Sequence, residues 1–208
     1  MSTITLLHKE LHYESLLYSE PVTEESFARD FEVKSGEWSY RNGSVVGKNP
    51  EEFPGMIILK KDFFGDVMVD FVAKVLPPST HDINVMWNGS WNEDFDTRGV
   101  AYVAGLGGWW GGKAGIEKSP DYRLNVGTPL FDLVPGREYH IQAGSCAGHC
   151  FIIVDGRLII EVTDPDPIDS SVHGKVGFEA FASQIAIREI KVYSLTCKML
   201  REHYSREL

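Results

Sequence analysis

Residues 67–75 read Val-Met-Val-Asp-Phe-Val-Ala-Lys-Val. The first, third, fifth, seventh and ninth residues are all apolar, whereas the others include Asp70 and Lys74. Because successive side chains of a β-strand point to opposite faces, this alternation predicts a strand with one face in a hydrophobic core. Helical periodicity is nearly absent from the rest of the chain.

Short runs of this kind recur along the sequence, separated by Gly, Pro, Asn and Asp, as in sandwiches and barrels. Asn42-Gly43 and Asp155-Gly156 tolerate the positive φ values of tight hairpin turns. The predicted strands are 38–46 (a hairpin), 56–60, 67–75, 82–88, 99–105, 122–127, 138–144, 151–154, 158–162, 176–181 and 185–193. So many strands are typical of an all-β, two-sheet antiparallel jelly-roll β-sandwich rather than a smaller immunoglobulin-like domain.

The chain shows no sign of a division into domains. No internal repeat, low-complexity tract or Pro/Ser-rich linker interrupts it. We therefore expect a single domain over residues 1–208, with a β core over 17–195 and terminal extensions over 1–16 and 196–208. Within these extensions, Leu6–Leu17 and Lys198–Glu207 are candidates for short helices.

The charge of the chain bears on its partners and location. Its 208 residues include 20 Lys and Arg against 30 Asp and Glu, a formal charge of -10. This charge repels phosphate backbones and anionic lipids, which argues against nucleic acid or a membrane as a partner. Lys9 and Glu10 interrupt the region where a signal peptide needs an apolar stretch, so we expect a cytoplasmic protein.

Three cysteines, Cys146, Cys150 and Cys197, are an odd number, which suits a reducing compartment better than a disulfide framework. Cys146, His149 and Cys150 lie in Ser-Cys-Ala-Gly-His-Cys, a pattern that suggests zinc. No second pair of ligands follows at finger-like spacing, however. A hairpin turn with incidental thiols is the interpretation that we favour.

From Leu17 to Leu195, a series of short motifs resembles the 3-keto-disaccharide hydrolase domain family, which has the concanavalin A-like lectin/glucanase fold. The motifs are Gly36-Glu37-Trp38-Ser39, Asn42-Gly43-Ser44-Val45-Val46-Gly47, Phe64-Gly65-Asp66-Val67, Val69-Asp70-Phe71, Pro135-Gly136-Arg137-Glu138-Tyr139, Val154-Asp155-Gly156-Arg157, Thr163-Asp164-Pro165, Gly174-Lys175-Val176-Gly177-Phe178-Glu179 and Ile187-Arg188-Glu189-Ile190-Lys191-Val192. The chain is also similar to the YesU-like family of bacterial proteins with a galectin-like sandwich. Both resemblances imply a β-sandwich that acts on or binds carbohydrate.

The chain departs from the hydrolase family at two positions. Glu179 stands where the family commonly has glutamine, and Asn88 stands where it commonly has arginine. The first change brings a group that can transfer protons, and the second removes a positive charge. The family's substrate therefore does not transfer directly to this chain.

Alternation within two predicted strands points to candidate site residues. In residues 82–88, Trp87 falls on the core face, whereas Asn84 and Asn88 fall on the other face, where their amides suit sugar hydroxyls. In residues 176–181, Val176, Phe178 and Ala180 fall on the core face and Glu179 on the opposite one. Glu179 is therefore a candidate general acid or base, with His81 as a second proton-transfer group. The alternative is a solvated glutamate paired with Arg188.

The segment from Gly89 to Gly115 carries many potential ligand-binding residues, and we expect it to be an exposed loop. Its aromatic rings suit the C–H faces of a pyranose, and its charged groups suit sugar hydroxyls. The candidate substrate-binding residues of this segment are Trp91, Arg98, Trp109, Trp110 and Lys113. Alternatively, the segment folds over one end of the sandwich or forms a homodimer interface, where aromatic residues are also enriched.

Asp94 and Asp96, with Glu93, are weak candidates for binding Ca²⁺ through their carboxylate oxygens. No EF-hand spacing is present, so we expect no metal or other cofactor.

The sequence leaves three functional hypotheses. The first is an enzyme that cleaves a glycoside or keto-sugar derivative by acid–base chemistry on the concave sheet. The second is a non-catalytic carbohydrate-binding protein of the galectin or lectin type. The third is a structural partner of another sugar-processing enzyme. Because one fold hosts many functions, only the site distinguishes them.

Overall fold

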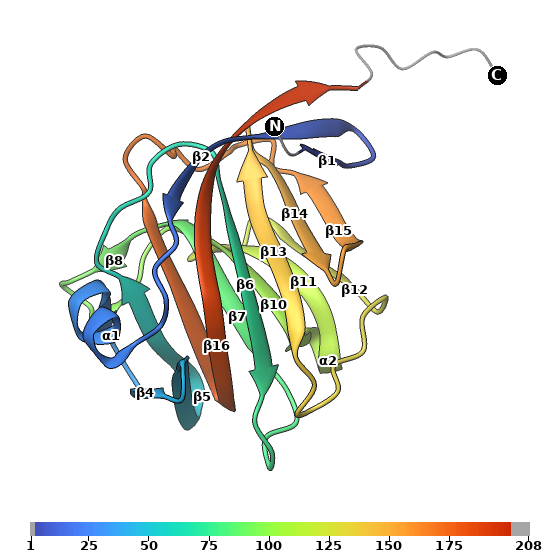
Figure 1. Cartoon of the computed structure of the whole chain (residues 1–208). Helices are drawn as coiled ribbons and strands as arrows, with labels where there is room; N and C mark the ends of the chain where they lie inside the picture. The colour runs from blue at the N-terminus through green and yellow to red at the C-terminus, as the bar shows by residue number, and fades with distance from the viewer. Residues whose placement is uncertain (1–2, 201–208) are drawn as a thin grey trace.

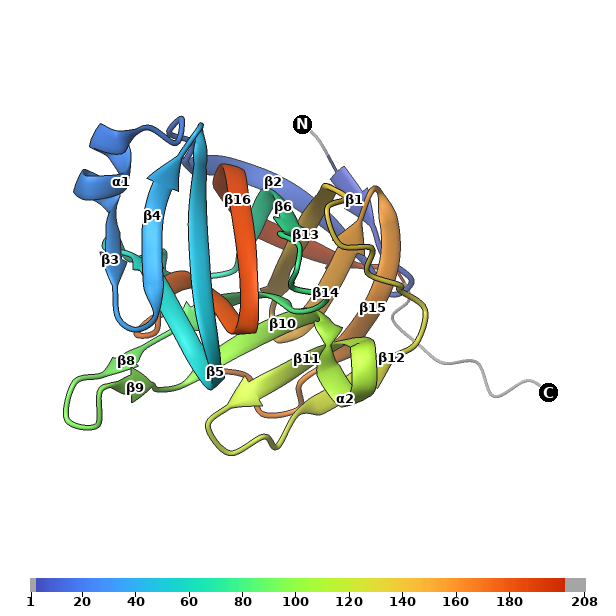
Figure 2. The same ribbon diagram turned by 90° about the horizontal axis from the view of Figure 1, so that it is seen from below.

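The fold was determined as a computed structural model that describes residues 3–200, apart from the side chains of residues 51, 52, 109 and 110. Two antiparallel sheets pack face to face, as Figure 1 and the view from below in Figure 2 show. This is the all-β jelly-roll sandwich that the sequence predicts.

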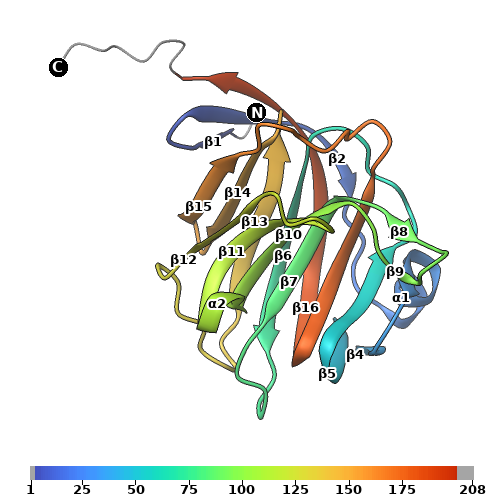
Figure 3. The same cartoon turned by 180° about the vertical axis from the view of Figure 1, so that it is seen from behind.

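One layer, which we call the front sheet, faces the viewer in Figure 3. Its strands lie in the order β12, β11, β10, β7, β16, β5 and β3. Their bounds are β12 (Asn125–Thr128), β11 (Lys113–Ser119), β10 (Ala101–Gly108), β7 (Ile83–Gly89), β16 (Lys175–Met199), β5 (Ser44–Leu59) and β3 (Phe31–Val33).

The other layer, the back sheet, has the order β15, β14, β13, β6, β16, β5 and β4. The strands that it does not share with the front sheet are β15 (Arg157–Thr163), β14 (His149–Val154), β13 (Tyr139–Cys146), β6 (Val67–Val75) and β4 (Glu37–Arg41). Beyond it, β2 (Lys9–Tyr18) pairs with the end of β16, and β1 (Thr3–Thr5) pairs with β2.

The long strands β5 and β16 belong to both layers. The first part of β16 pairs with β7, and the part after Ser183 pairs with β6. The register between β16 and β5 shifts between Phe181 and Ser183, where Ala182 has a φ of 47°. Because such a bulge bends a strand, one continuous chain segment passes from the front sheet to the back sheet here.

The core lies between the two sheets. It contains the predicted apolar face of β6, together with Trp87 of β7 and Phe178 of β16. The indole Nε1 of Trp87 donates to Ser145 Oγ at 2.9 Å, which satisfies its one polar atom inside the core. The predicted core faces of these three strands are therefore confirmed.

The predicted tight turns are also present. Asn42-Gly43 joins β4 to β5 with φ values of 48° and 78°, and Asp155-Gly156 joins β14 to β15 with 50° and 76°. Ala147-Gly148 forms a similar turn between β13 and β14, so Cys146 and Cys150 lie on the two arms of a hairpin. All three cysteines have free thiols.

The expected terminal helix over Leu6–Leu17 is wrong. Most of this segment is strand β2, because its backbone pairs with β16 and Leu11 is completely buried. The second expected helix, Lys198–Glu207, begins with residues of β16, and positions 201–207 lie outside the described residues.

Two short helices occur elsewhere. Helix α1 (Glu24–Asp30) begins with a capping box, in which Thr23 and Ser26 each bind the backbone N–H of the other. Helix α2 (Trp109–Gly112) joins β10 to β11. In the part of the chain that the structure describes, no helix has the length and apolar character needed to span a bilayer.

Candidate functional site

A small hairpin, β8 (Trp91–Asn92) and β9 (Thr97–Arg98), projects at one side in Figure 2, and its side chains Trp91 and Arg98 contact the outer face of the front sheet. Trp91 packs against an apolar cluster on that face. The ammonium group of Lys34 lies 5.3 Å from the Trp91 ring and 3.1 Å from a carboxylate oxygen of Glu93, which ties the hairpin to the end of β3. The cluster consists of Met56, Ile58, Met86, Ala101 and Val103.

This arrangement corrects the expectation of an open loop from Gly89 to Gly115. The segment contains the β8–β9 hairpin, all of β10, helix α2 and the first residues of β11. The predicted strand 99–105 corresponds to β10, which pairs with β7 and β11 in the front sheet, whereas the glycines of this segment concealed the start of β11.

Beside the apolar cluster lies a buried polar group that we call the carboxylate cluster: Asp82, Asn84, Arg98, Glu117 and Glu179. Asn84 of β7 and Glu179 of β16 are direct register partners, and Glu117 comes from β11. Arg98 reaches from the hairpin to the sheet. The side chains of Arg98, Glu117 and Glu179 are each less than 10% exposed.

Arg98 holds the two glutamates together. Its Nη2 donates to Glu117 Oε1 at 3.0 Å, and its Nη1 donates to Glu179 Oε2. Its Nε donates to Ser119 Oγ at 3.2 Å. Every nitrogen of the guanidinium therefore has a partner within the protein. Such charge-assisted hydrogen bonds fix the position of both carboxylates.

Asp82 and Asn84 are the members of the cluster with unused hydrogen-bonding capacity. Asp82 is 6% exposed and Asn84 is 3% exposed, and the Asn84 amide hydrogen-bonds to the Asp82 carboxylate. Among the described residues, no group binds the Oδ1 atom of either side chain. A buried polar atom without a partner is costly, so these two oxygens are the atoms of the cluster that a donor from outside the chain would satisfy.

The backbone around Asp82 is also unusual. Asp82 has a φ of 79°, in the left-handed region that few side chains adopt, and such strain is concentrated at functional sites. The backbone of Gly108 approaches so closely that a Cβ there would lie 2.2 Å from Asp82 Oδ1. A glycine at position 108 is therefore required for the carboxylate to occupy this position.

Burial makes the three acids of the cluster hard to ionise. It raises the pKa of Asp82 to about 7, with a further increase from Glu179 and a decrease from the Asn84 hydrogen bond. Burial likewise raises the pKa of Glu117 to about 7, although Arg98 acts in the opposite direction. The pKa of Glu179 is raised by burial, against the influence of Arg98. Carboxyl groups that titrate near neutral pH can both donate and accept protons there.

These pKa values predict how stability depends on pH. Between about pH 5 and 7 the folded protein keeps protons on Asp82 and Glu117 that the unfolded chain has lost, so the free energy of unfolding should fall as the pH rises. Each group contributes about 1.4 kcal/mol per pH unit at most. Urea unfolding at pH 5, 6, 7 and 8 measures this slope, and Asp82→Asn with Glu117→Gln should flatten it. An unchanged slope in the double variant contradicts the assignment.

Sequence reasoning found part of this cluster. It identified Glu179, Asn84 and Arg98, which the structure brings together, although Glu179 is buried against Arg98 rather than solvated. Its suggested partner Arg188 instead binds Glu138, with Nη2 and Oε2 2.8 Å apart. Asp82 and Glu117 were missed. Asp82 lies just before the start of β7 and has a left-handed φ, so strand alternation gave no guide to where its side chain points.

Two other candidates lie apart from the cluster. Asn88 is buried and not ligand-facing, because its amide donates to Gly65 O at 2.9 Å and accepts from Ser145 Oγ at 3.1 Å. The left-handed φ of 43° at Asn88 disrupts the alternation on which the prediction relied. The ring of His81 pairs with Thr80 Oγ1 at 3.2 Å near the surface.

The remaining predicted residues are spread over the hairpin and the start of β11. Trp91 is partly buried and donates from Nε1 to Asp96 Oδ1 at 3.3 Å. Lys113 is exposed. Asp94 and Asp96 are exposed near the hairpin turn, and among residues 3–200 no three His, Cys, Asp or Glu side chains gather as metal ligands. The side chains of Trp109 and Trp110 lie outside those that the structure describes.

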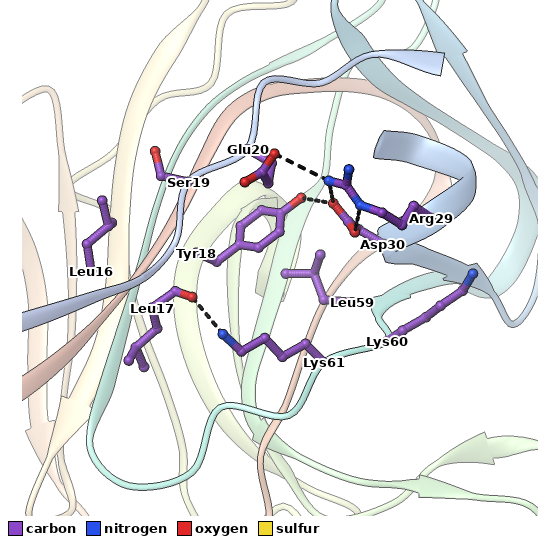
Figure 4. A pocket seen from close by; sticks show the side chains of 10 residues that line it. All are labelled: Leu16, Leu17, Tyr18, Ser19, Glu20, Arg29, Asp30, Leu59, Lys60 and Lys61. Atoms are coloured by element: carbon purple, nitrogen blue, oxygen red, sulfur yellow. Dashed lines mark hydrogen bonds and ion pairs between the residues drawn. The ribbon is translucent and has the colours of Figure 1, made fainter. Parts of the chain in front are cut away.

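A surface hollow of about 690 Å³ lies elsewhere, between β2, α1 and the end of β5 (Figure 4). Its polar groups satisfy one another. The Tyr18 hydroxyl donates to Asp30 at 3.1 Å, Arg29 binds Asp30 and Glu20, and Lys61 donates to Leu17 O at 2.8 Å. The carboxylate cluster, with its two unpartnered oxygens, is therefore the stronger candidate site.

No protein-family model matches the sequence, and no curated protein is significantly similar to it. Solved structures resemble the fold. A Bacillus subtilis protein of unknown function with a galectin-like fold has a TM-score of 0.70 at 14% identity, over 89% of this chain and 98% of that chain.

Two further structures have names that refer to sugars. The carbohydrate recognition domain of Emp46p, in its potassium-bound form, has a TM-score of 0.61 at 12% identity, over 85% of this chain and 96% of its own. The carbohydrate-binding module CBM66 of Bacillus subtilis has a TM-score of 0.57 at 12% identity, over 81% and 95%. This chain thus has a galectin-like β-sandwich fold.

Proposed function

We propose that this protein binds carbohydrate on the outer face of its front sheet, with Asp82 and Asn84 as hydrogen-bonding groups. The observation that carries the proposal is the pair of buried Oδ1 atoms without a partner among the described residues. Sugar hydroxyls are donors of the kind that these oxygens lack.

The surroundings of the pair support a sugar as the ligand. Arg98 and the two glutamates are fixed by mutual hydrogen bonds, so the polar groups are preorganised before a ligand arrives. Carbohydrate recognition and carbohydrate binding are also named for two proteins with a similar fold.

A second candidate function is acid–base cleavage of a glycoside or keto-sugar derivative at the same cluster. It is favoured by the pKa values of about 7 for Asp82 and Glu117. The nearby Glu179 carboxylate contributes to raising both of these pKa values. Carboxyl groups that titrate near the working pH are effective general acids and bases.

Binding can be tested by affinity electrophoresis through gels that contain neutral, amino-bearing or acidic soluble polysaccharides, followed by calorimetry with oligosaccharides of those that retard the protein. We expect retardation by at least one polysaccharide. Asn84→Leu, which has similar volume but no amide, should weaken that binding about tenfold or more, since polar groups on the ligand and on Asp82 lose a partner. If none of the polysaccharides retards the protein, the proposal is wrong.

Tyr18→Phe is the matched control, because it removes one hydroxyl from the surface hollow and leaves the cluster intact. If Tyr18→Phe weakens binding and Asn84→Leu does not, the sugar sits in the hollow and the proposed site is wrong. Thermal unfolding of both variants checks that each remains folded.

Catalysis is tested separately by incubation with a panel of glycosides and their 3-keto derivatives, with released sugar detected by mass spectrometry. If the protein releases sugar and the variants Glu179→Gln and Asp82→Asn do not, the second candidate is supported. Binding without turnover on every compound leaves a lectin-like function.

A further inference from the structure

We propose that the carboxylate cluster selects sugars that carry a protonated amino group over the corresponding neutral sugars, and discriminates against acidic sugars. This inference rests on the proposed carbohydrate-binding function. It names the chemical class of ligand that the site takes.

The charge of the cluster is the first argument. Asp82, Glu117 and Glu179 provide three buried carboxyl groups, whereas Arg98 is the cation that contacts two of them. Each of these acids that ionises adds a negative charge to the cluster, and the single positive charge of Arg98 can balance only one of them. A bound ammonium group offsets part of the remaining negative charge, whereas a bound carboxylate or sulfate increases it.

The hydrogen bonds of Arg98 are the second argument. Acidic sugars are commonly held by an arginine that presents two free N–H groups to the anion. Here Nη1, Nη2 and Nε are each engaged, with Glu179, Glu117 and Ser119. Because its positive charge is already shared between two buried carboxylates, Arg98 attracts a further anion less than an unpaired arginine does. Lys113, the other cation predicted for the site, is exposed at the start of β11.

The two unpartnered oxygens are the third argument. Asp82 Oδ1 and Asn84 Oδ1 are both acceptors, they belong to residues that are more than nine-tenths buried, and the two side chains hydrogen-bond to each other. An ammonium group has three N–H donors and no acceptor, so it matches two neighbouring acceptors better than a hydroxyl does. Hydrogen bonds to an ionised carboxylate are also stronger than those to a neutral acceptor.

The test uses matched triads of monosaccharides: glucose, glucosamine and glucuronic acid, with the galactose and mannose equivalents. Binding is measured at pH 6.5, where amino sugars are protonated, by saturation-transfer NMR and calorimetry. We expect at least one amino sugar to bind about tenfold more tightly than its neutral counterpart, and the uronic acids to bind more weakly than either.

Asp82→Asn is the informative variant, because asparagine tolerates the positive φ of this position and keeps the shape of the side chain. It should weaken binding of the amino sugar by more than binding of the neutral sugar, and so remove most of the preference between the two. Asp94→Asn removes the same charge from the exposed hairpin, so it controls for net charge and should leave the preference unchanged.

The outcomes separate the two proposals. If neutral sugars bind as well as amino sugars, or acidic sugars bind best, the selectivity is wrong and carbohydrate binding stands. If Asp82→Asn and Asp94→Asn reduce the preference equally, net charge and not the cluster produces it. If no monosaccharide of any triad and no polysaccharide binds, both proposals fail.

Discussion

Arg98→Met should destabilise the protein by about 3–5 kcal/mol at pH 8, because it removes the cation from two buried carboxylates and leaves their charge uncompensated. Methionine keeps most of the length and apolar stem of arginine, so the change acts mainly on charge and hydrogen bonding. The measurement is urea unfolding at pH 8 and again at pH 5.

The pH dependence distinguishes an electrostatic effect from a packing effect. Without Arg98, the pKa values of Glu117 and Glu179 should rise further, since the arginine lowers both. At pH 5 these acids are then protonated in the folded variant, and the destabilisation should be smaller than at pH 8. An equal cost at both pH values contradicts this account.

Arg123→Met is the matched control. Arg123 has a side chain that is 74% exposed, and its Nε lies 3.9 Å from Asp121 Oδ2. An exposed ion pair of this kind contributes about 1 kcal/mol or less. If the two arginine variants cost the same, Arg98 does not hold the cluster together.

Most strands and turns of the sandwich could be predicted from the sequence, because they depend on residues that are close together in the chain. Every second residue from 67 to 75 is apolar, and the bounds of β6 match the prediction. The Asn42-Gly43 and Asp155-Gly156 turns likewise follow from the φ values that these residues tolerate. Strand β2 was mistaken for a helix because its pairing with β16 joins segments almost 180 residues apart.

The candidate site could be predicted only in part, because it depends on contacts between residues that are far apart in the sequence. Face alternation placed Asn84 and Glu179 correctly on the outer face, but it carries no information about what covers that face. The contact of Arg98 with Glu179 spans 81 residues, and it forms only because the β8–β9 hairpin folds over the sheet. Glu117 was missed because the glycines around β11 suggested a loop.

Phe178→Ala should cost about 3–5 kcal/mol, because Phe178 is completely buried in the core and its ring meets that of Phe71 edge-on, with the centroids 5.1 Å apart. Truncation leaves a cavity between the two sheets that rigid strands cannot close. Urea unfolding at pH 7 measures this cost.

The adjacent residue on β16 should behave differently. Glu179→Gln keeps the shape of the side chain and mimics the protonated carboxyl, the form that burial favours, while Arg98 retains Glu117 as a partner. We therefore expect a stability change of about 1.5 kcal/mol or less at pH 7. We also expect sugar binding or turnover to weaken about tenfold or more, since glutamine can neither ionise when a ligand binds nor exchange a proton with it.

Comparing these two variants distinguishes a ligand site from a purely structural ion pair. If Glu179→Gln destabilises the protein as much as Phe178→Ala and leaves sugar binding unchanged, the buried charges serve the fold alone. If Glu179→Gln leaves the stability nearly unchanged and weakens sugar binding or turnover, the outer face is functional. Because residues 178 and 179 point to opposite faces of one strand, each variant controls for the backbone position of the other.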